Sequence, residues 1–175
     1  VNSAAEKCKD QIGDKWEKFS NYWRTTQLEY TWLRSLMGRH KDFWEITEDS
    51  LEKSMENFNI NRSMKNELLD LYKTLSTFEE VPETLKILKE KNYKLAILSN
   101  GTPHLLNKLV RSNKLENLFD DLFSIEEVGI YKPDSKVYGM PTKKYNIKVN
   151  EVAFLSANTW DVSGGGNYGF NAIWV

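Results

Sequence analysis

The sequence predicts an α/β protein in which a helical segment precedes a parallel β-sheet that has its own helices. Two observations support this prediction. Residues 1–78 contain no proline, and their large apolar side chains recur every three or four positions, which is the period of an amphipathic helix. From residue 79 onward, short apolar runs alternate with helical patterns, an order typical of βαβ units and of a parallel sheet.

The first predicted helix carries an apolar stripe and should end at Gly38, because glycine readily adopts the left-handed conformation at a helix C-terminus. A second helix is expected from Thr47 to Asn57, with Thr47 or Asp49 as its N-cap. A third is expected after Ser63, whose hydroxyl would cap it. The stripe of the first helix consists of Trp16, Phe19, Trp23, Leu28, Trp32, Leu33 and Leu36.

Four short apolar runs are expected to form the strands of the sheet. They are Lys94 to Ser99, Leu122 to Ile125, Val152 to Ser156 and Ala172 to Val175. Helices are expected before and between these strands, and a loop and a short helix should lead to the glycine run at residues 164–166. The other helices of this part are expected at Pro82 to Leu88, Thr102 to Val110 and Ser135 to Tyr145.

The bulk composition excludes several classes of function. The chain has 175 residues with 24 basic and 25 acidic side chains, and its net charge of -1 gives no electrostatic reason to expect nucleic acid or a membrane surface as a partner. No apolar run approaches the roughly 20 residues that span a bilayer. Cys8 is the only cysteine, which excludes an intrachain disulfide and a thiolate metal cluster. We therefore expect a protein of the reducing cytoplasm.

Three polar clusters follow predicted strands, at the edge of the sheet where α/β proteins bind ligands. The first consists of Ser99 and Asn100. A hydroxyl and backbone N–H groups at a strand end suit an anion such as a carboxylate or a phosphate. The same dipeptide is equally compatible with a turn in which Asn100 and Gly101 supply a positive φ.

The other two clusters carry charged side chains. Lys132 could hold a neighbouring carboxylate ionised, although most lysines lie on the surface. Asp161 could orient or deprotonate a water molecule, and Ser156 and Asn158 could hold that water or an oxyanion. Alternatively, Asn158 caps a helix and Asp161 lies in its first turn, where a negative charge favours the helix dipole. The two interpretations are compatible.

Three segments resemble, in the same order, motifs of the haloacid dehalogenase superfamily. They are Leu98 to Gly101 (LSNG), Gly129 to Asp134 (GIYKPD) and Phe154 to Asp161 (FLSANTWD). In the helical part, Trp23-Arg24 and Gln27 to Gly38 (QLEYTWLRSLMG) resemble the signature of the L-2-haloacid dehalogenases in particular. Each motif alone is weak, but their order and the long helical match are specific, and the resemblance covers essentially the whole chain.

The resemblance implies a Rossmann-like parallel sheet core at residues 79–175 and an inserted helical cap subdomain at residues 1–78 that closes over the site. It implies hydrolytic dehalogenation of small (S)-2-haloacids to (R)-2-hydroxyacids, without a cofactor or a metal ion. An aspartate attacks C2 and expels the halide with inversion, and water then hydrolyses the resulting ester. Family members often form dimers, and the aromatic-rich cap is compatible with a homodimer as well as with intrachain packing.

The resemblance also implies a role for individual residues. Arg24, helped by Asn100, would receive the leaving halide, because a guanidinium is always charged and weakly hydrated. Ser99 would help to bind the substrate carboxylate, and Lys132 would keep the nucleophile anionic. Tyr138 matches a tyrosine that the family uses in catalysis. The hydrolytic water would be positioned or activated by Ser156, Asn158 and Asp161, and the apolar wall around the C2 substituent would consist of Leu28, Phe43 and Trp160.

Without the resemblance, these residues have simpler interpretations. Arg24 would be a surface arginine and Tyr138 an interior tyrosine, while the three wall residues would be ordinary core side chains. His40 and His104 have no partner at a recognisable catalytic or metal-binding spacing, so the sequence assigns them no role.

One motif of the family has no counterpart in residues 1–175. The family nucleophile is an aspartate in the first strand, followed a few residues later by Gly-Thr, and this pattern does not occur. The chain begins at Val1 without a methionine and ends at Val175 within an apolar run. We therefore expect the first strand and its aspartate to lie upstream, and a last strand and helix downstream. Asp161 matches the water-handling position and is not a substitute nucleophile.

Two alternative functions remain open from the sequence. The first is a Mg²⁺-dependent phosphatase of the same superfamily, but the metal-dependent members usually carry an acid at the position of Ser156. A serine there removes a hard anionic ligand, and Trp160 makes the pocket more apolar. The second is a non-catalytic relative that has lost its nucleophile, which an aspartate upstream of Val1 would exclude.

Overall fold

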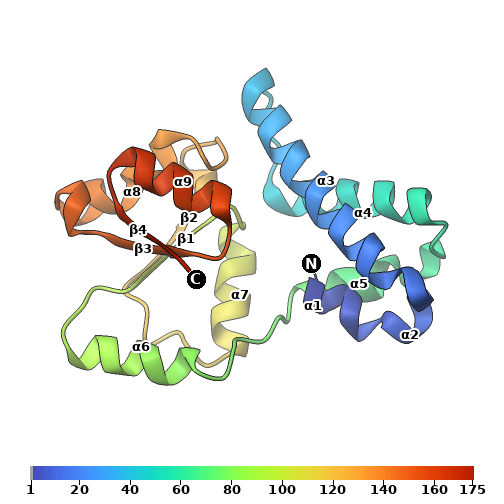
Figure 1. The fold of residues 1–175 in the computed structure, drawn as a ribbon, viewed down its shortest axis with the longest axis horizontal. Coiled ribbons are helices and arrows are strands. Elements are labelled where there is room, and N and C mark those ends of the chain that lie inside the picture. The colour runs from blue at the N-terminus through green and yellow to red at the C-terminus, as the bar shows by residue number, and fades with distance from the viewer. Residues whose placement is uncertain (1) are drawn as a thin grey trace.

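The computed structural model describes residues 2–175, and the helices of its first part pack on one another beside a mixed α/β part (Figure 1). We call helices α1 to α5 the helical segment. Within residues 2–175, no helix is both long enough and apolar enough to cross a bilayer. The helices of this segment are α1 (Asn2–Lys7), α2 (Lys9–Ile12), α3 (Trp16–Met37), α4 (Phe43–Phe58) and α5 (Lys65–Tyr72).

Local hydrogen bonds explain where the long helices begin and end. As predicted, α3 ends at Gly38, which has a φ of 62°, and the N–H of Arg39 returns to the carbonyl of Arg34 at 3.0 Å. Helix α4 begins four residues earlier than Thr47. The Asp42 carboxylate accepts the N–H of Glu45 at 2.9 Å and is the N-cap. The prediction of Thr47 or Asp49 as the cap is therefore wrong.

Two further local predictions need correction. The side chain of Asn61 accepts the N–H of Ser63 at 3.0 Å, so Asn61, and not Ser63, caps the turn Arg62–Met64 before α5. Thr47 lies inside α4, where its hydroxyl donates to the Phe43 carbonyl at 2.7 Å. A polar side chain in a helix can satisfy its own helix instead of capping it, and the sequence does not distinguish the two outcomes.

The core of the helical segment lies between α1, α3, α4 and α5. Five of its side chains are fully buried: Phe19, Trp23, Ile46, Leu51 and Leu68. The indole N–H of Trp23 donates to the carbonyl of Thr47 at 3.2 Å. Burying large apolar side chains supplies most of the stability of such a bundle, so α3 is fixed along most of its length.

The α/β part contains two parallel strand pairs. In the first, Ala96 pairs with Asp121 and Ser99 with Ser124. In the second, Ala153 pairs with Asn171 and Ser156 with Trp174. The parallel pairing of these strands was predicted. The elements are α6 (Val81–Glu90), β1 (Ala96–Ser99), α7 (Pro103–Ser112), β2 (Asp121–Ser124), α8 (Ser135–Tyr145), β3 (Ala153–Ser156), α9 (Thr159–Tyr168) and β4 (Asn171–Trp174).

The sequence suggested that a short helix would lead to the glycine run at residues 164–166. In the structure, this run lies inside α9 instead. A Cβ on Gly165 would lie 2.6 Å from the ring of Phe154 on β3, whereas a Cβ on Gly166 would meet its nearest neighbour at 3.6 Å. Contacts under about 3 Å are too close for carbon atoms. Glycine is therefore required at position 165 so that α9 can lie against β3.

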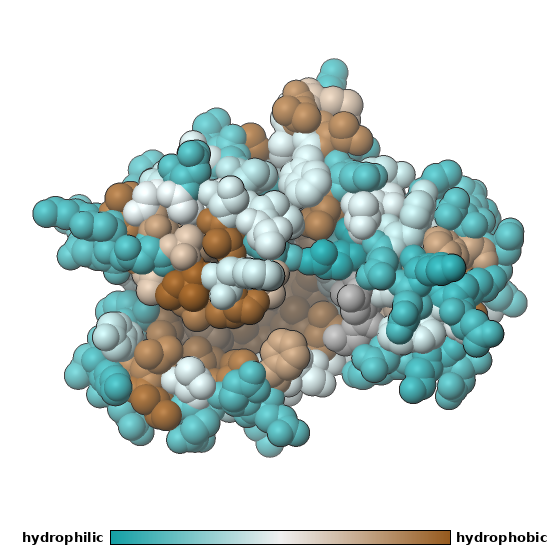
Figure 2. Space-filling view, in the orientation of Figure 1, coloured by the Kyte–Doolittle hydropathy of each residue, from teal (hydrophilic) through white to brown (hydrophobic). Residues whose placement is uncertain are grey.

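Among the described residues, the strands form two separate two-stranded sheets, β1–β2 and β3–β4. Apolar side chains remain exposed where these sheets and α6 face each other, and Figure 2 shows them around a hollow between β3–β4 and α6. Helix α6 is amphipathic but buries no residue fully. A large exposed apolar surface usually marks an interaction site. The exposed apolar residues on these elements are Ile87 of α6, Leu155 of β3, and Ile173 and Trp174 of β4.

Asp120 links the residue before β1 to α6 through a hydrogen bond and an ion pair. Its carboxylate accepts the N–H of Leu95 at 2.8 Å and forms ion pairs with Lys89 at 2.8 Å and Lys94 at 3.3 Å. The hydrogen bond from Lys89, followed by that from the Leu95 N–H, lowers the pKa of Asp120 from 3.8 to about 2. A carboxylate whose pKa is lower in the folded state stabilises the fold above its unfolded pKa, and this contribution disappears as the pH falls toward the folded value.

We predict that Asp120→Asn lowers the free energy of unfolding by about 1 kcal/mol at neutral pH, because the ion pairs with Lys89 and Lys94 are lost. The difference from the parent should narrow as the pH falls from about 4 toward 2. Urea unfolding at a series of pH values measures both effects. Asp70→Asn is the control, since Asp70 is an exposed partner of Lys73, and a constant difference at all pH values would contradict the prediction.

Candidate functional site

A pocket of about 280 Å³ lies where α3 meets the ends of β1 and β3. Of the residues that the sequence assigned to a site, all but Tyr138 and Ser156 line this pocket. The carboxyl ends of parallel strands are the usual binding edge of α/β proteins, so the prediction of a shared site is consistent with this geometry. The lining residues are Arg24, Gln27, Leu28, Phe43, Tyr72, Leu98, Ser99, Asn100, Lys132, Asn158, Trp160 and Asp161.

Asp161, in the first turn of α9, is the centre of the polar network. Its Oδ2 accepts hydrogen bonds from Lys132 Nζ at 2.9 Å and from the Ser156 hydroxyl at 2.9 Å. Its Oδ1 accepts one from the Tyr138 hydroxyl at 2.8 Å. A carboxylate that accepts three such bonds is held in one orientation. Tyr138 and Ser156 thus lie behind Asp161, which is why they do not border the pocket.

Lys132 is a buried lysine, with only 6% of its side chain exposed. Burial lowers the pKa of its ammonium group, and the nearby Asp161 carboxylate opposes this effect. The ammonium also lies 4.9 Å from the ring centre of Phe154 and 5.8 Å from that of Tyr138, where aromatic faces attract a cation. The pair Lys132–Asp161 is therefore enclosed by protein on most sides.

Arg24 joins the helical segment to this network. Its Nη2 donates to the Oδ1 of Asn158. Asn158 precedes α9 as its N-cap residue, but its side chain makes no capping bond, and its backbone N–H donates to the Ser156 hydroxyl at 3.2 Å. The capping interpretation thus holds for the position of Asn158 but not for its amide, which is directed to Arg24.

The pair Ser99–Asn100 forms a turn at the end of β1 without positive φ at Asn100 or Gly101. The Ser99 hydroxyl accepts the N–H of Gly101 at 3.0 Å, and the Asn100 Oδ1 accepts the backbone N–H of Lys132 at 3.3 Å. The interpretation that Asn100 and Gly101 supply a positive φ is therefore wrong. A Cβ there would lie 3.2 Å from Leu106, so close packing is the relevant constraint.

One side of the pocket is apolar. Leu28 of α3 and Phe43 of α4 line it, together with Trp160 at the start of α9. The ring of Trp160 meets that of Trp32 edge-on, at 5.6 Å between centres, which is a favourable aromatic geometry. The indole of Trp160 is therefore supported from the helical segment.

Sequence reasoning missed three lining residues, Gln27, Leu98 and Tyr72. The carboxamide of Gln27 donates to the Thr47 hydroxyl at 2.6 Å and to the Tyr72 hydroxyl at 3.3 Å. Burial raises the pKa of Tyr72, which keeps its hydroxyl protonated. Gln27 lies three residues after Arg24 on α3, and this helical spacing was the one available signal.

The charge of the pocket favours an anionic ligand. Arg24 and Lys132 contribute two cations, while Asp161 is the one carboxylate among the lining residues. No group of three or more His, Cys, Asp or Glu side chains within the described residues is arranged to hold a metal ion. The arrangement can bind a small anion beside an apolar group.

Comparisons with known proteins point to one family. The family described as haloacid dehalogenase-like hydrolase matches residues 16–175. (S)-2-haloacid dehalogenase 1 of Pseudomonas sp. (strain CBS-3) is 40% identical over 175 residues, which are 99% of this chain and 77% of the relative. (S)-2-haloacid dehalogenase 4A of Burkholderia cepacia is 37% identical, over 99% of this chain and 76% of the relative.

Solved structures of dehalogenases are also similar. The structure of L-2-haloacid dehalogenase from Xanthobacter autotrophicus with chloropropionic acid covalently bound matches with a TM-score of 0.87 and 32% identity, over 97% of this chain and 69% of that one. A crystal structure of a dehalogenase matches with a TM-score of 0.97 and 36% identity, over 99% and 78% of the two chains. The fold of this chain is thus that of known dehalogenases.

Gly164 provides a test of the network around Asp161. A Cβ at this position would lie 2.4 Å from the Tyr138 hydroxyl and 2.9 Å from Pro133. We predict that Gly164→Ala displaces Tyr138 from Asp161 and lowers the free energy of unfolding by about 1 to 3 kcal/mol, the usual cost of overpacking. Chemical denaturation measures the change. Gly166→Ala, in the same helix with 3.6 Å to its nearest neighbour, is the matched control, and equal effects of the two variants would refute the explanation.

Proposed function

Because the chain belongs to the haloacid dehalogenase-like hydrolase family, we propose that it hydrolyses the carbon–halogen bond of small (S)-2-haloacids to give (R)-2-hydroxyacids. The observation that carries this proposal is the pocket at the ends of β1 and β3, where Arg24 and Lys132 face an apolar wall. A 2-haloacid presents the matching features, which are a carboxylate, a halogen and a short alkyl group. In this proposal the helical part, residues 1–78, is a cap over the core at residues 79–175.

Each part of the substrate has a complementary group in the pocket. Arg24, helped by Asn100, would receive the leaving halide, because the guanidinium is weakly hydrated and suits a large, diffuse anion. Ser99 would help to bind the carboxylate. Leu28, Phe43 and Trp160 would enclose the C2 substituent. An apolar wall also excludes water, which strengthens the attraction between Arg24 and the departing anion.

The nucleophile in this proposal is an aspartate outside residues 1–175. Asp161 is the one lining residue with a carboxylate, and its two oxygens already accept bonds from Lys132, Ser156 and Tyr138. A strand between β1 and β3 would cover the apolar surface around the hollow and bring such an aspartate to the pocket. The Xanthobacter autotrophicus relative with chloropropionic acid covalently bound supports an ester intermediate.

Asp161 serves the second step in this proposal. In the first step, a carboxylate oxygen of the nucleophilic aspartate outside residues 1–175 displaces the halide at C2 with inversion. A water molecule then attacks the carbonyl carbon of the resulting ester. Asp161 would accept a proton from this water, while Ser156 and Asn158 would help to position it. Tyr138 and Lys132 would hold the Asp161 carboxylate in place, and Lys132 would also keep the nucleophile ionised. The products are a 2-hydroxyacid and the regenerated aspartate.

We expect this reaction to need no metal ion. The alternative in the same superfamily, a Mg²⁺-dependent phosphatase, needs hard carboxylate ligands at the site. Here Ser156 offers a hydroxyl, which already donates to Asp161, and Asp161 is paired with a buried lysine. A divalent cation would have to compete with the Lys132 ammonium for that carboxylate.

The proposal predicts stereoselective halide release. The chain is extended at its N-terminus with the segment of the Pseudomonas sp. (strain CBS-3) relative that precedes the matched region, and halide is measured with L- and D-2-chloropropanoate, with and without EDTA. The extended chain should release halide from the L-substrate only, whether or not EDTA is present. The 175-residue chain should release none, because the proposed nucleophile lies outside it.

Arg24→Ala in the extended chain should lower kcat/KM about 100-fold or more, since a partly buried partner of the leaving anion is removed. Arg62→Ala is the control, because Arg62 is an exposed arginine of the helical segment. Mg²⁺-dependent hydrolysis of a phosphate ester, without halide release, would replace this function by the phosphatase. Halide release by the unextended chain would instead show that residues 1–175 contain the nucleophile.

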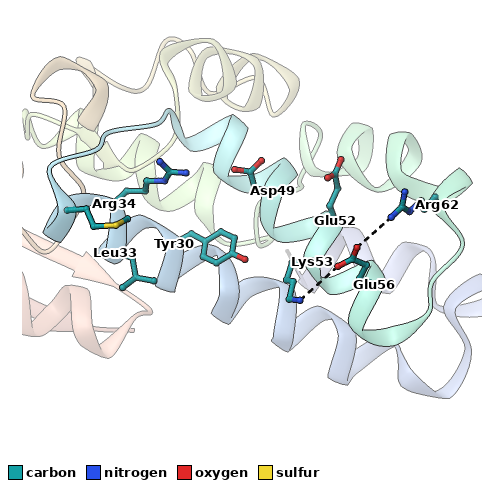
Figure 3. Close-up of a pocket in the computed structure, with 9 residues that line it drawn as sticks. Tyr30, Leu33, Arg34, Asp49, Glu52, Lys53, Glu56 and Arg62 are labelled. Carbon is teal, nitrogen blue, oxygen red and sulfur yellow. Dashed lines mark ion pairs between the residues drawn. The ribbon is translucent and has the colours of Figure 1, made fainter.

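We also propose that the chain forms a homodimer through the end of α3. Leu36 and Met37 lie about one helical turn after Leu33, and all three are exposed, Leu36 to 84%. A cavity of about 580 Å³ between α3 and α4, which Leu33 and Met37 help to line, also carries basic and acidic side chains. Among these, Glu56 lies between Lys53 and Arg62 (Figure 3). A face that carries both charges and an apolar stripe can pair with a copy of itself about a two-fold axis.

Leu36→Asp tests this interface. A charge in the centre of the apolar stripe should convert a dimer to a monomer at micromolar concentration, because it would be buried without a partner. Light scattering coupled to size-exclusion chromatography measures the mass. Phe78→Asp, at an equally exposed apolar residue outside the stripe, should leave the dimer intact. A monomeric parent chain would exclude the interface.

A further inference from the structure

The residue directly before Lys132 is held by the helical segment. Tyr131 belongs to the loop between β2 and α8, and only 1% of it is exposed. Its backbone N–H donates to the Ser35 hydroxyl of α3 at 3.2 Å, and its phenol donates to the carbonyl of Lys41 at 2.5 Å. Both partners lie near residue 38, where the chain passes from α3 to α4. Tyr131 is thus fixed at its backbone and at its side chain by the same part of the helical segment.

Glu126 anchors the neighbouring residues of that part. Its Oε1 accepts the backbone N–H of Phe43 at 3.2 Å, and its Oε2 lies 2.7 Å from Nε2 of His40. The rings of His40 and Phe43 lie 5.3 Å and 6.3 Å from that of Tyr131, between centres. The sequence assigned no role to His40. Residues 40–43 are therefore held against the α/β part by contacts with both Glu126 and Tyr131.

Lys132, which follows Tyr131, is held from the opposite side. Its backbone N–H donates to Asn100 and its ammonium to Asp161. The loop is therefore clamped between the helical segment on one side and the ends of β1 and β3 on the other. Through Ser35, α3 therefore directly contacts the residue that is covalently joined to Lys132.

We propose that Tyr131 is a positioning residue, which couples the placement of the helical segment to the placement of the Lys132 ammonium group. This inference rests on the proposed function only for its effect on catalysis, since the contacts of Tyr131 do not depend on the reaction. Through Tyr131, the Lys132 ammonium would reach its position in the pocket only when the helical segment is docked over that pocket.

The groups that face Lys132 explain why its position matters. Asp161 comes from α9, the rings of Tyr138 and Phe154 from α8 and β3, and Arg24 lines the same pocket from α3. Burial lowers the pKa of Lys132. If the loop loosens, water reaches the ammonium and its pKa returns toward the ordinary value of lysine.

The first experiment needs no activity. The titration of the Lys132 ammonium is followed by NMR of selectively labelled lysine in the 175-residue chain, with Lys132→Arg used to assign the signal. Tyr131→Phe and Ser35→Ala each remove one contact with the helical segment and should raise the pKa of Lys132 by about half a unit or more. Ser35→Ala also keeps the test available if Tyr131→Phe does not fold.

Two matched variants control for general loss of stability. Tyr145→Phe removes a phenol that donates to Asp121 at 2.6 Å, away from the pocket. Ser54→Ala removes a buried hydroxyl that donates within α4. Both should leave the titration of Lys132 unchanged. If Tyr131→Phe and Ser35→Ala also leave it unchanged, the proposed coupling is wrong.

The second experiment measures kinetics in the N-terminally extended chain. Tyr131→Phe should lower kcat about 10-fold with little change in KM, because a misplaced Lys132 impairs chemistry more than substrate binding. Tyr145→Phe should keep the parent kcat. An unchanged kcat in Tyr131→Phe would overturn the coupling. If no variant or parent releases halide while the titration of Lys132 shifts as expected, the proposed function fails and the positioning role stands.

Discussion

The ion pair between Lys132 and Asp161 is the interaction on which the site depends. Its two side chains are 6% and 7% exposed, and their charged atoms lie 2.9 Å apart. Removing two charges from water costs several kcal/mol, and attraction within the pair repays this only when the remaining hydrogen-bonding positions are satisfied. Tyr138 and Ser156 supply those bonds to Asp161. The pair is thus stable as a group of four, and the loss of any member leaves a buried charge incompletely bonded.

Several features of the fold are consequences of enclosing this group. Gly164 leaves room for the Tyr138 hydroxyl, and Gly165 lets α9 lie against Phe154, whose ring faces the Lys132 ammonium. The helical segment closes the remaining side through Arg24 and through the contacts of Tyr131. A helix interior normally disfavours glycine by about 1 kcal/mol relative to alanine, and here that cost is offset by close approach around a buried charge.

The sequence predicted the strands to within one or two residues, because short apolar runs between turns leave few alternatives. The sequence also predicted that polar residues after the strands would share one site, because the carboxyl ends of parallel strands lie at the same edge. Most of the predicted site residues do line one pocket. The prediction failed where a choice depends on tertiary contacts. Asp42 caps α4, although Thr47 is also of a residue type that is favoured at helix N-caps. The contact between His40 and Glu126 joins residues that are 86 positions apart, and no local pattern records it.

The chemistry of Asp161 and the hollow between β3–β4 and α6 both indicate that the nucleophile is a second carboxylate on a further strand. A carboxylate that accepts bonds from an ammonium and two hydroxyls is a poor nucleophile, because attack on carbon would break those bonds. In the proposed reaction its role is instead to orient the hydrolytic water molecule and accept its proton. A covalent mechanism therefore requires a second carboxylate, and the two cations of the pocket can accommodate one. The hollow between β3–β4 and α6 has exposed apolar walls, so a strand that covers them could bring that carboxylate to the pocket between Lys132 and Arg24.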